Sequence, residues 1–144
     1  MKSKKRSVAN SKSRLPERPT LFIDRSLGHR VVADALRHEG ARIELHDDHF
    51  VATTSDETWL KAIGAKGWII LTKDHKIRYN PRAVHAIKES KVIIVSLARG
   101  NYTGSQMAEM FVKALRGIEN LPKRVKPPAF FTFGKRGRLR RVEI

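Results

Sequence analysis

Short apolar runs alternate with longer amphipathic segments along most of this chain, and this alternation limits the folds that it can adopt. Residues 20–23, 68–71 and 92–95 are mainly apolar and of strand length, and residues 42–46 alternate between polar and apolar side chains. Segments with helical spacing of apolar residues separate these runs. Strands that alternate with helices are typical of a parallel sheet with helices on its faces. The sequence therefore predicts an α/β fold with a central, mostly parallel sheet of about four strands.

Four helices are predicted around these strands. The first spans about 27–38, the second begins at a capping box in which Glu57 reaches back to Thr54, the third begins at Asn80 and Pro81, and the fourth spans about 104–120 until Pro122 stops it. Thr103 and Gln106 cap the fourth helix. The side chains expected to face the core are Leu27, Val31, Ala35 and Leu36, then Trp59, Leu60 and Ile63, then Val84 and Ile87, and finally Met107, Met110, Phe111, Ala114, Leu115 and Ile118.

The two ends of the chain differ from its middle. Residues 1–19 are basic with almost nothing apolar, which predicts a tail that is disordered when free; it is either a phosphate-binding arm or a solvated leader. Residues 20–122 form the predicted domain, and 123–144 a basic extension. Within it, residues 127–144 are expected to add a β-hairpin to a sheet edge. Its phenylalanines either stack bases or, more in keeping with their common use, pack onto the domain.

The charge of the chain favours a polyanionic partner. Lys and Arg number 30 against 14 Asp and Glu, a formal net charge of +16, which points to nucleic acid. Cysteine is absent, so disulfides, thiolate zinc sites, iron–sulfur clusters and cysteine nucleophiles are excluded. No P-loop, dinucleotide-binding glycine pattern, serine-hydrolase elbow or zinc-protease motif is present. Without a secretory signal or an apolar run long enough to span a membrane, we expect a cytoplasmic protein.

The few acidic residues gather where predicted strands end. Asp24 follows the first strand, Asp47 and Asp48 follow the second, and Asp74 follows the third. Because the carboxyl ends of parallel strands line one crevice, these carboxylates should be neighbours. Their mutual repulsion favours a divalent cation, and hard oxygen ligands suit Mg²⁺ or Mn²⁺. We therefore expect Asp24 and Asp74 to bind metal that activates water for attack on a phosphodiester.

The remaining acids and the basic residues around them have alternative interpretations. Asp56 and Glu57 are either metal ligands or simply acids that complement a helix N-terminus. The run 46–49 is better explained as a polar loop than as a transition-metal site. Basic side chains near the acids either contact the phosphate backbone of a substrate, the interpretation that we prefer, or form a solvated face. The candidate substrate-binding residues are Arg25, Arg30, Lys73, His75, Lys76, Arg78 and Arg99.

Four segments together resemble a known family. They are residues 22–28 (FIDRSLG), 46–50 (HDDHF), 55–60 (SDETWL) and 70–74 (ILTKD), and in this order and spacing they resemble the PIN-like domain of bacterial VapC-type toxins over about residues 20–118. The resemblance implies a three-layer α/β/α domain and a Mg²⁺-dependent endoribonuclease paired with an antitoxin; a homodimer is left open. It also implies that Asp24, Asp56 or Glu57, and Asp74 take the metal-binding acid positions.

One departure from the family concerns the fourth strand. PIN nucleases usually carry another acid after it, whereas residues 96–101 contain none; Ser96 or Asn101 could supply an uncharged oxygen instead, or the site holds one metal rather than two.

Our main hypothesis is an RNA-cleaving enzyme in which Asp24, Asp74 and Asp56 act through metal-activated water. A first alternative is a non-catalytic RNA- or DNA-binding module. A second, a phosphoacceptor signalling domain, is disfavoured because such domains have paired acids after strand one and are not strongly basic.

Overall fold

Six strands form one sheet in the order β3-β2-β4-β5-β6-β7 in the computed structural model, which describes residues 17–28 and 30–144. Neighbouring strands pair in parallel except β6 and β7, which are antiparallel. The predicted α/β fold with a mostly parallel sheet is therefore confirmed, whereas the predicted N-terminal tail lies almost wholly outside the described residues. The strands are β2 (Thr20–Ile23), β3 (Arg42–Leu45), β4 (Ile69–Thr72), β5 (Ile93–Leu97), β6 (Ala129–Phe133) and β7 (Arg140–Val142).

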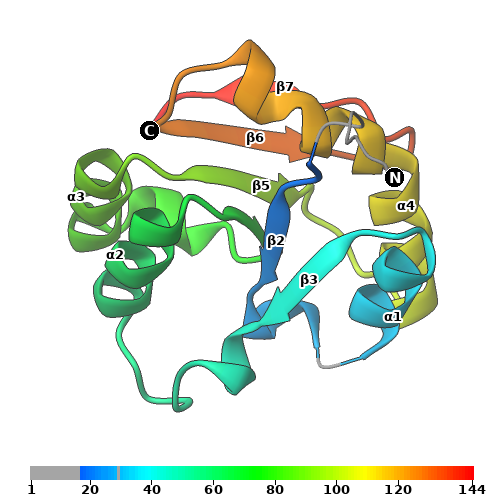
Figure 1. Cartoon of the computed structure of the whole chain (residues 1–144), viewed down its shortest axis with the longest axis horizontal. Helices are drawn as coiled ribbons and strands as arrows, with labels where there is room; N and C mark the ends of the chain where they lie inside the picture. The colour runs from blue at the N-terminus through cyan, green and yellow to red at the C-terminus, as the bar shows by residue number, and fades with distance from the viewer. Residues whose placement is uncertain (1–16, 29) are drawn as a thin grey trace, which may run out of the picture.

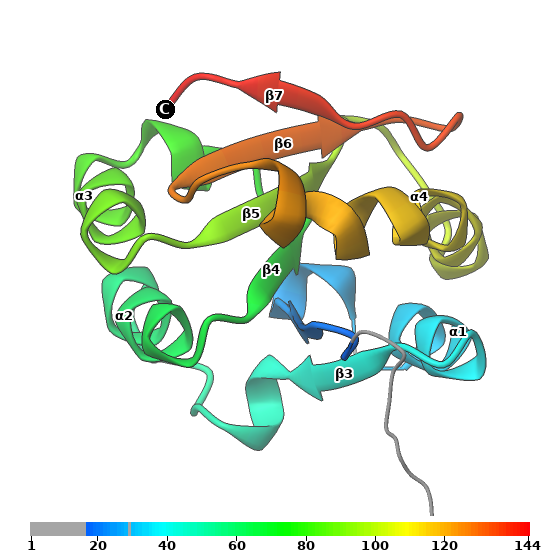
Figure 2. The same ribbon diagram turned by 45° about the horizontal axis from the view of Figure 1, so that its top comes forward.

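Helices cover both faces of the sheet and give three layers (Figures 1 and 2). On one face α1 (Val31–His38) packs beside α4 (Gly104–Arg124), and on the other α2 (Asp56–Lys66) packs beside α3 (Pro81–Ser90). Among the described residues, no helix has the length and apolar character that a membrane span requires. Three short 3-10 helices follow the ends of strands: η1 (Arg25–Leu27), η2 (His46–Asp48) and η3 (Lys76–Tyr79).

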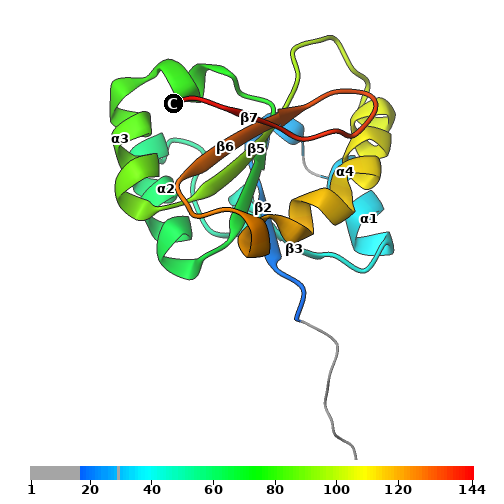
Figure 3. The same cartoon turned by 90° about the horizontal axis from the view of Figure 1, so that it is seen from above.

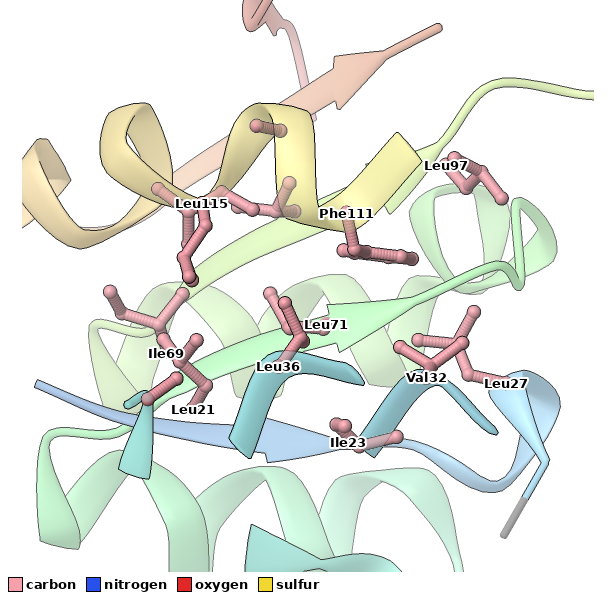
Figure 4. Packing of buried hydrophobic residues seen from close by; sticks show 14 of the residues in the cluster. Leu21, Ile23, Leu27, Val32, Leu36, Ile69, Leu71, Leu97, Phe111 and Leu115 are labelled. Atoms are coloured by element: carbon pink, nitrogen blue, oxygen red, sulfur yellow. The ribbon is translucent and has the colours of Figure 1, made fainter. Parts of the chain in front are cut away.

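Alternating side chains of each strand fill two separate cores. Leu21, Ile23 and Leu71 point toward α1 and α4, where Figure 4 shows them against side chains of both helices. Phe22 and Ile70 point the other way, toward α2 and α3. Because successive strand residues face opposite sides, residues two positions beyond Phe22 and Ile70 return to the side of α2 and α3. This alternation directs Asp24 and Thr72 to that side of the sheet.

The first helix starts later than the spacing predicts. Leu27 belongs to η1, and Gly28 follows it with a φ of 81°, a left-handed conformation that glycine adopts without steric cost. The helix begins only at Val31, so the predicted span of 27–38 is wrong at its start. The inward face also differs, because Val32 and Ala33 are buried whereas Val31 is 51% exposed.

Two further helix boundaries differ in detail. Ser55, not Thr54, caps α2, because its Oγ accepts the Thr58 N–H at 3.3 Å. Pro122 does not stop α4, which continues to Arg124. Proline removes only one backbone donor, and the Val125 N–H still reaches the Leu121 carbonyl at 3.0 Å beyond it. The predicted caps at Asn80 and at Thr103 with Gln106 are confirmed.

The C-terminal hairpin is part of the sheet rather than an appendage. Its first strand, β6, pairs in parallel with β5, and β7 then returns antiparallel as the sheet edge, as Figure 3 shows from above. Phe130, Phe131 and Phe133 are all buried, so these rings serve packing. The extension therefore supplies a fifth parallel strand, beyond the four that were predicted.

Candidate active site

Three aspartates approach one another at the carboxyl edge of the parallel strands. Asp24 directly follows β2, Asp74 comes two residues after β4, and Asp56 is the first residue of α2. Pairing between β2 and β4 continues to the edge, because the Asp24 N–H donates to the Leu71 carbonyl at 3.0 Å. The structure thus brings together the three aspartates that sequence reasoning singled out.

Two hydroxyl groups hold the Asp24 carboxylate. Ser26 Oγ and Thr72 Oγ1 each donate to Asp24 Oδ2 at 2.8 Å. Each hydroxyl also accepts a backbone N–H from the segment after β4: Ser26 from Lys73 at 3.0 Å, and Thr72 from Asp74 at 2.9 Å. Since a hydroxyl has a single proton to donate, these backbone donors fix the direction in which both protons point. The two hydrogen bonds therefore hold the Asp24 carboxylate in one orientation.

Asp74 is anchored to the same turn. Its backbone meets Thr72, and its Oδ1 accepts the Lys76 N–H at 2.9 Å, which caps the turn into η3. Thr72, with no exposed surface, therefore joins Asp24 and Asp74 through one oxygen atom. Any change at that oxygen affects both aspartates.

Asp56 is held from within its own helix. The Trp59 indole Nε1 donates to Asp56 Oδ1 at 3.1 Å, and Trp59 is buried. Burial raises the pKa of the Asp56 carboxyl; the Trp59 hydrogen bond lowers it, and the negative charges of Asp24 and Asp74 raise it further. The charges of Asp24 and Asp74 therefore both act on the Asp56 carboxyl at this edge of the sheet.

The oxygen ligands at this edge suit a hard divalent cation that needs only one or two protein carboxylates. Within the described ranges, no three His, Asp or Glu side chains are arranged around one point as a metal cage would require. Mg²⁺, however, commonly uses one or two carboxylates and completes its shell with water and phosphate oxygens. Asp24 and Asp74 could supply these carboxylates: Thr72 contacts the Asp24 carboxylate and the Asp74 backbone N–H, and Asp56 adds negative charge nearby. The residues present therefore suit Mg²⁺ or Mn²⁺.

The other predicted acids and histidines have different surroundings. The Glu57 carboxylate lies 3.9 Å from Arg82 Nη1 on α3, and it is not among the charges that raise the pKa of Asp56. His46 is 3% exposed beside the Phe22 and Trp59 rings. His49 Nε2 lies 2.7 Å from Glu44 Oε1 instead of turning toward His46. The run 46–49 thus consists of η2, with a buried His46, and of His49, which contacts Glu44.

The predicted substrate-binding residues fall into two groups. Arg30, Lys76 and Arg99 are exposed, and Lys73 is partly exposed. All four are near in sequence to a strand end at the acidic edge, the name used below for the edge of the sheet that carries Asp24, Asp56 and Asp74. Arg25 and Arg78 have protein partners, and His75 is partly enclosed.

Local contacts set the roles open to these three residues. Arg25 Nε forms an ion pair with Asp47 Oδ1 at 3.0 Å. Arg78 donates to the Glu143 carbonyl and lies over the Phe130 ring, so it joins η3 to the C-terminal hairpin. Burial lowers the pKa of His75, and the Arg99 charge lowers it further, so His75 is neutral at pH 7.

The end of β5 offers no carboxylate, as expected from the sequence. Ser96 is fully buried and its hydroxyl donates to the Leu97 carbonyl at 3.3 Å, while Asn101 is exposed in the loop before α4. Ser96 stands opposite Thr72 in the register of β4 and β5. A buried hydroxyl therefore occupies the strand position nearest to the missing acid.

Sequence reasoning missed the residues that support the aspartates. Ser26, Thr72 and Trp59 hold Asp24, Asp74 and Asp56, yet none was a candidate site residue. One signal was available: Trp59 lies three positions after Asp56, which brings both side chains to one face of a helix. For Ser26 and Thr72, 46 residues apart along the chain, only the strand order brings them into contact.

Comparisons with known proteins agree with this geometry. A family model described as "PIN like domain" matches residues 19–99, more than half of the chain and the part that contains all three aspartates. "Putative ribonuclease VapC45" from Mycobacterium tuberculosis (strain ATCC 25618 / H37Rv) is 28% identical over 102 residues, covering 68% of this chain and 74% of that protein. No solved structure matches the chain significantly. The fold, the acidic edge and the matching segment together show that the chain belongs to the PIN-like domain family.

Proposed function

We propose that the protein is an endoribonuclease that hydrolyses RNA phosphodiester bonds with the help of Mg²⁺ or Mn²⁺. The observation that supports this most strongly is the placement of Asp24, Asp56 and Asp74 at one edge of the sheet in a protein with net charge +16. Repelling carboxylates are stabilised by a cation, and a basic surface attracts the polyanion that such a cation would help to cleave. The relative named as a ribonuclease adds support from outside the chain.

Each aspartate has a distinct part in this proposal. Asp24 and Asp74 would hold the metal ion, and Asp56 would add negative charge beside it or hold a water molecule by hydrogen bonding. When bound, the metal lowers the pKa of water and offsets charge on the phosphate during in-line attack. Arg99, Lys73 and Lys76 would contact phosphates on either side of the cleaved bond.

The test is cleavage of a mixed RNA pool with Mg²⁺ or Mn²⁺, with EDTA as the metal-free control. Asp24→Asn and Asp74→Asn should abolish cutting, whereas Asp34→Asn, which changes an exposed acid in the first turn of α1, should leave it unchanged. Equal cutting by all three variants, or cutting that survives EDTA, would refute the proposal.

A second candidate is a non-catalytic RNA- or DNA-binding module. It is favoured by the absence of a three-residue metal cage within the described residues and of an acid after β5. Isothermal titration with Mn²⁺ separates the two: binding near one ion per chain, lost in Asp24→Asn, supports the enzyme. RNA binding without metal binding supports the module.

The resemblance to VapC-type toxins extends the proposal to the cell. We propose that the protein acts in the cytoplasm as the toxin of a toxin–antitoxin pair and that an antitoxin protein suppresses its ribonuclease activity. Growth arrest on expression, abolished by Asp24→Asn, is the expected result. Arrest that persists in that variant would contradict the toxin proposal.

A further inference from the structure

A groove opens between the end of β5 and the β6–β7 turn, and all of its lining except Ala98 lies outside the segment that matches the family. Its volume is about 410 Å³, and it is lined by Ala98, Thr132, Phe133, Arg138, Leu139 and Arg140. Ala98, Phe133 and Leu139 supply carbon surface, Thr132 adds a hydroxyl, and the two arginines supply guanidinium groups. A site of this size with mixed chemistry suits a small ligand that has an apolar ring and a negative charge.

Basic residues crowd the hairpin that borders this groove. Residues 135–141 (KRGRLRR) contain five cations, all on exposed residues. One of them is engaged elsewhere, because Arg141 donates to the Pro128 carbonyl and lies over the Phe131 ring. In the described part of the chain, no ion pair involves Arg138 or Arg140. A phosphate backbone would relieve the repulsion among these cations, and guanidinium groups bind phosphate oxygens in pairs.

A row of hydroxyl residues connects the groove to the acidic edge. Thr72, Ser96 and Thr132 stand opposite one another on β4, β5 and β6, on the face toward α2 and α3. At one end Thr72 donates to Asp24, and at the other Thr132 lines the groove. Two steps between parallel strands span roughly 10 Å. One strand of nucleic acid can therefore reach both places.

We propose that this groove holds one nucleotide of the RNA strand, its base against the apolar surface and its flanking phosphates on Arg138 and Arg140. The proposal rests on the proposed ribonuclease function, because it assigns the path of that substrate away from the cleaved bond. A base must leave its stack to enter the groove, so the RNA bound here is single-stranded. Arg99 is exposed and directly follows Ala98, which lines the groove.

An acidic protein segment is the competing occupant, and the groove favours RNA over it. Paired guanidinium groups beside an apolar wall match the alternating phosphates and bases of RNA, whereas an acidic peptide has no flat ring at each step to lie on that wall. Addition of a strand to β7 is also disfavoured, because β7 is three residues long and two of these are arginine.

The test is binding of a fluorescent ten-nucleotide single-stranded RNA to the full chain in EDTA, followed by anisotropy. Arg138→Gln/Arg140→Gln should weaken binding about tenfold and reduce the slope of log affinity against log salt by about 1.4, since each phosphate on a single strand contributes about 0.7. Arg116→Gln/Arg124→Gln removes the same charge from exposed positions on α4 and should change affinity by less than about twofold. Equal losses in both variants would overturn the proposal.

Photo-crosslinking locates the RNA without any substitution. RNA that carries 4-thiouridine should form adducts within residues 132–140, and adducts found only elsewhere would overturn the proposal.

Polyglutamate binding that the hairpin variant loses while it keeps its RNA affinity would assign the groove to an acidic protein instead. Wild-type protein that binds RNA as expected but never cuts it with Mg²⁺ contradicts the ribonuclease and leaves the groove standing. Cutting with unchanged binding and crosslinking in the hairpin variant contradicts the groove alone.

Discussion

The indole Nε1 of Trp59 donates a hydrogen bond to Asp56 Oδ1 at 3.1 Å, one helical turn along α2. Because this bond lowers the pKa of a carboxyl that burial and its neighbours raise, Trp59 keeps Asp56 ionised at lower pH than it would otherwise be. A large core residue is thus also a positioning residue for the acidic edge.

Trp59→Phe should reduce RNA cleavage at pH 7 roughly tenfold, because a hydrogen bond to a charged group contributes about 1.5–3 kcal/mol. The acid limb of the pH–rate profile should move to higher pH, a change that a packing defect alone does not produce. Trp68→Phe is the control, since Trp68 stacks near Phe22 in the same aromatic cluster. A profile that keeps its midpoint in Trp59→Phe would contradict this role.

Thr72→Val should destabilise the protein by about 1–3 kcal/mol and abolish cleavage. Valine has the shape of threonine without the hydroxyl, so the Asp24 carboxylate loses a donor and the partly buried Asp74 N–H loses its acceptor. Thr72→Ser keeps the hydroxyl and should retain both stability and most of the activity. Urea unfolding and cleavage assays measure the two effects. Similar behaviour of valine and serine variants would show that the oxygen atom is unimportant.

Asp56 should make the stability of the metal-free protein depend on pH. The pKa of Asp56 in the folded chain lies above its ordinary value of 3.8. Its contribution to the free energy of unfolding is therefore fully present below pH 3.8 and is lost as the pH rises through the pKa of the folded state. Asp56→Asn has no carboxyl to ionise, so it does not lose stability in this pH range, and its amide oxygen can still accept the Trp59 indole N–H. The variant should therefore gain stability relative to wild type between acidic and neutral pH, as measured by thermal unfolding. A difference between the two proteins that is constant with pH would contradict the raised pKa.

Arg18 and Glu119 should be coupled weakly. Arg18 Nε and Nη2 reach the two Glu119 oxygens at 2.9 Å each, and Nη1 donates to the Glu39 carbonyl at 3.0 Å. The Arg18 side chain is 39% exposed, so solvent screening limits the expected coupling energy to about 0.5–1 kcal/mol. A double-mutant cycle with Arg18→Ala and Glu119→Ala in urea measures this coupling. The pair Arg42 and Glu17, more exposed on both sides, is a control that should give less.

The fold and the position of the aspartates were largely predictable from sequence for a physical reason. The central strands β4 and β5 are apolar on both faces, so residues 68–71 and 92–95 stand out, and Asp24 and Asp74, which follow β2 and β4, must lie at the carboxyl edge of a parallel sheet. Helix starts depended on turns that the spacing does not reveal. The left-handed Gly28 delayed α1, and the choice of Ser55 over Thr54 was decided by one hydroxyl contact.

The supporting contacts were not predictable from spacing. Thr72 meets Asp24 only because β2 and β4 are neighbours although β3 lies between them in sequence, and no local pattern encodes that order. The parallel pairing of β6 was missed for the same reason, since residues 127–144 resemble an isolated hairpin until α4 is known to carry the chain back across the sheet.

The pairing of β6 with β5 also sets the order in which a growing chain can finish its fold. A ribosome produces all three aspartates before residues 129–133, yet β5 keeps an open edge until this strand arrives, and Phe130 and Phe131 belong to opposite cores. Contacts between such distant segments form slowly and leave apolar surface uncovered in the meantime. The acidic edge is thus synthesised early and supported late, so the nascent chain gains a rigid site only when translation of the hairpin is complete.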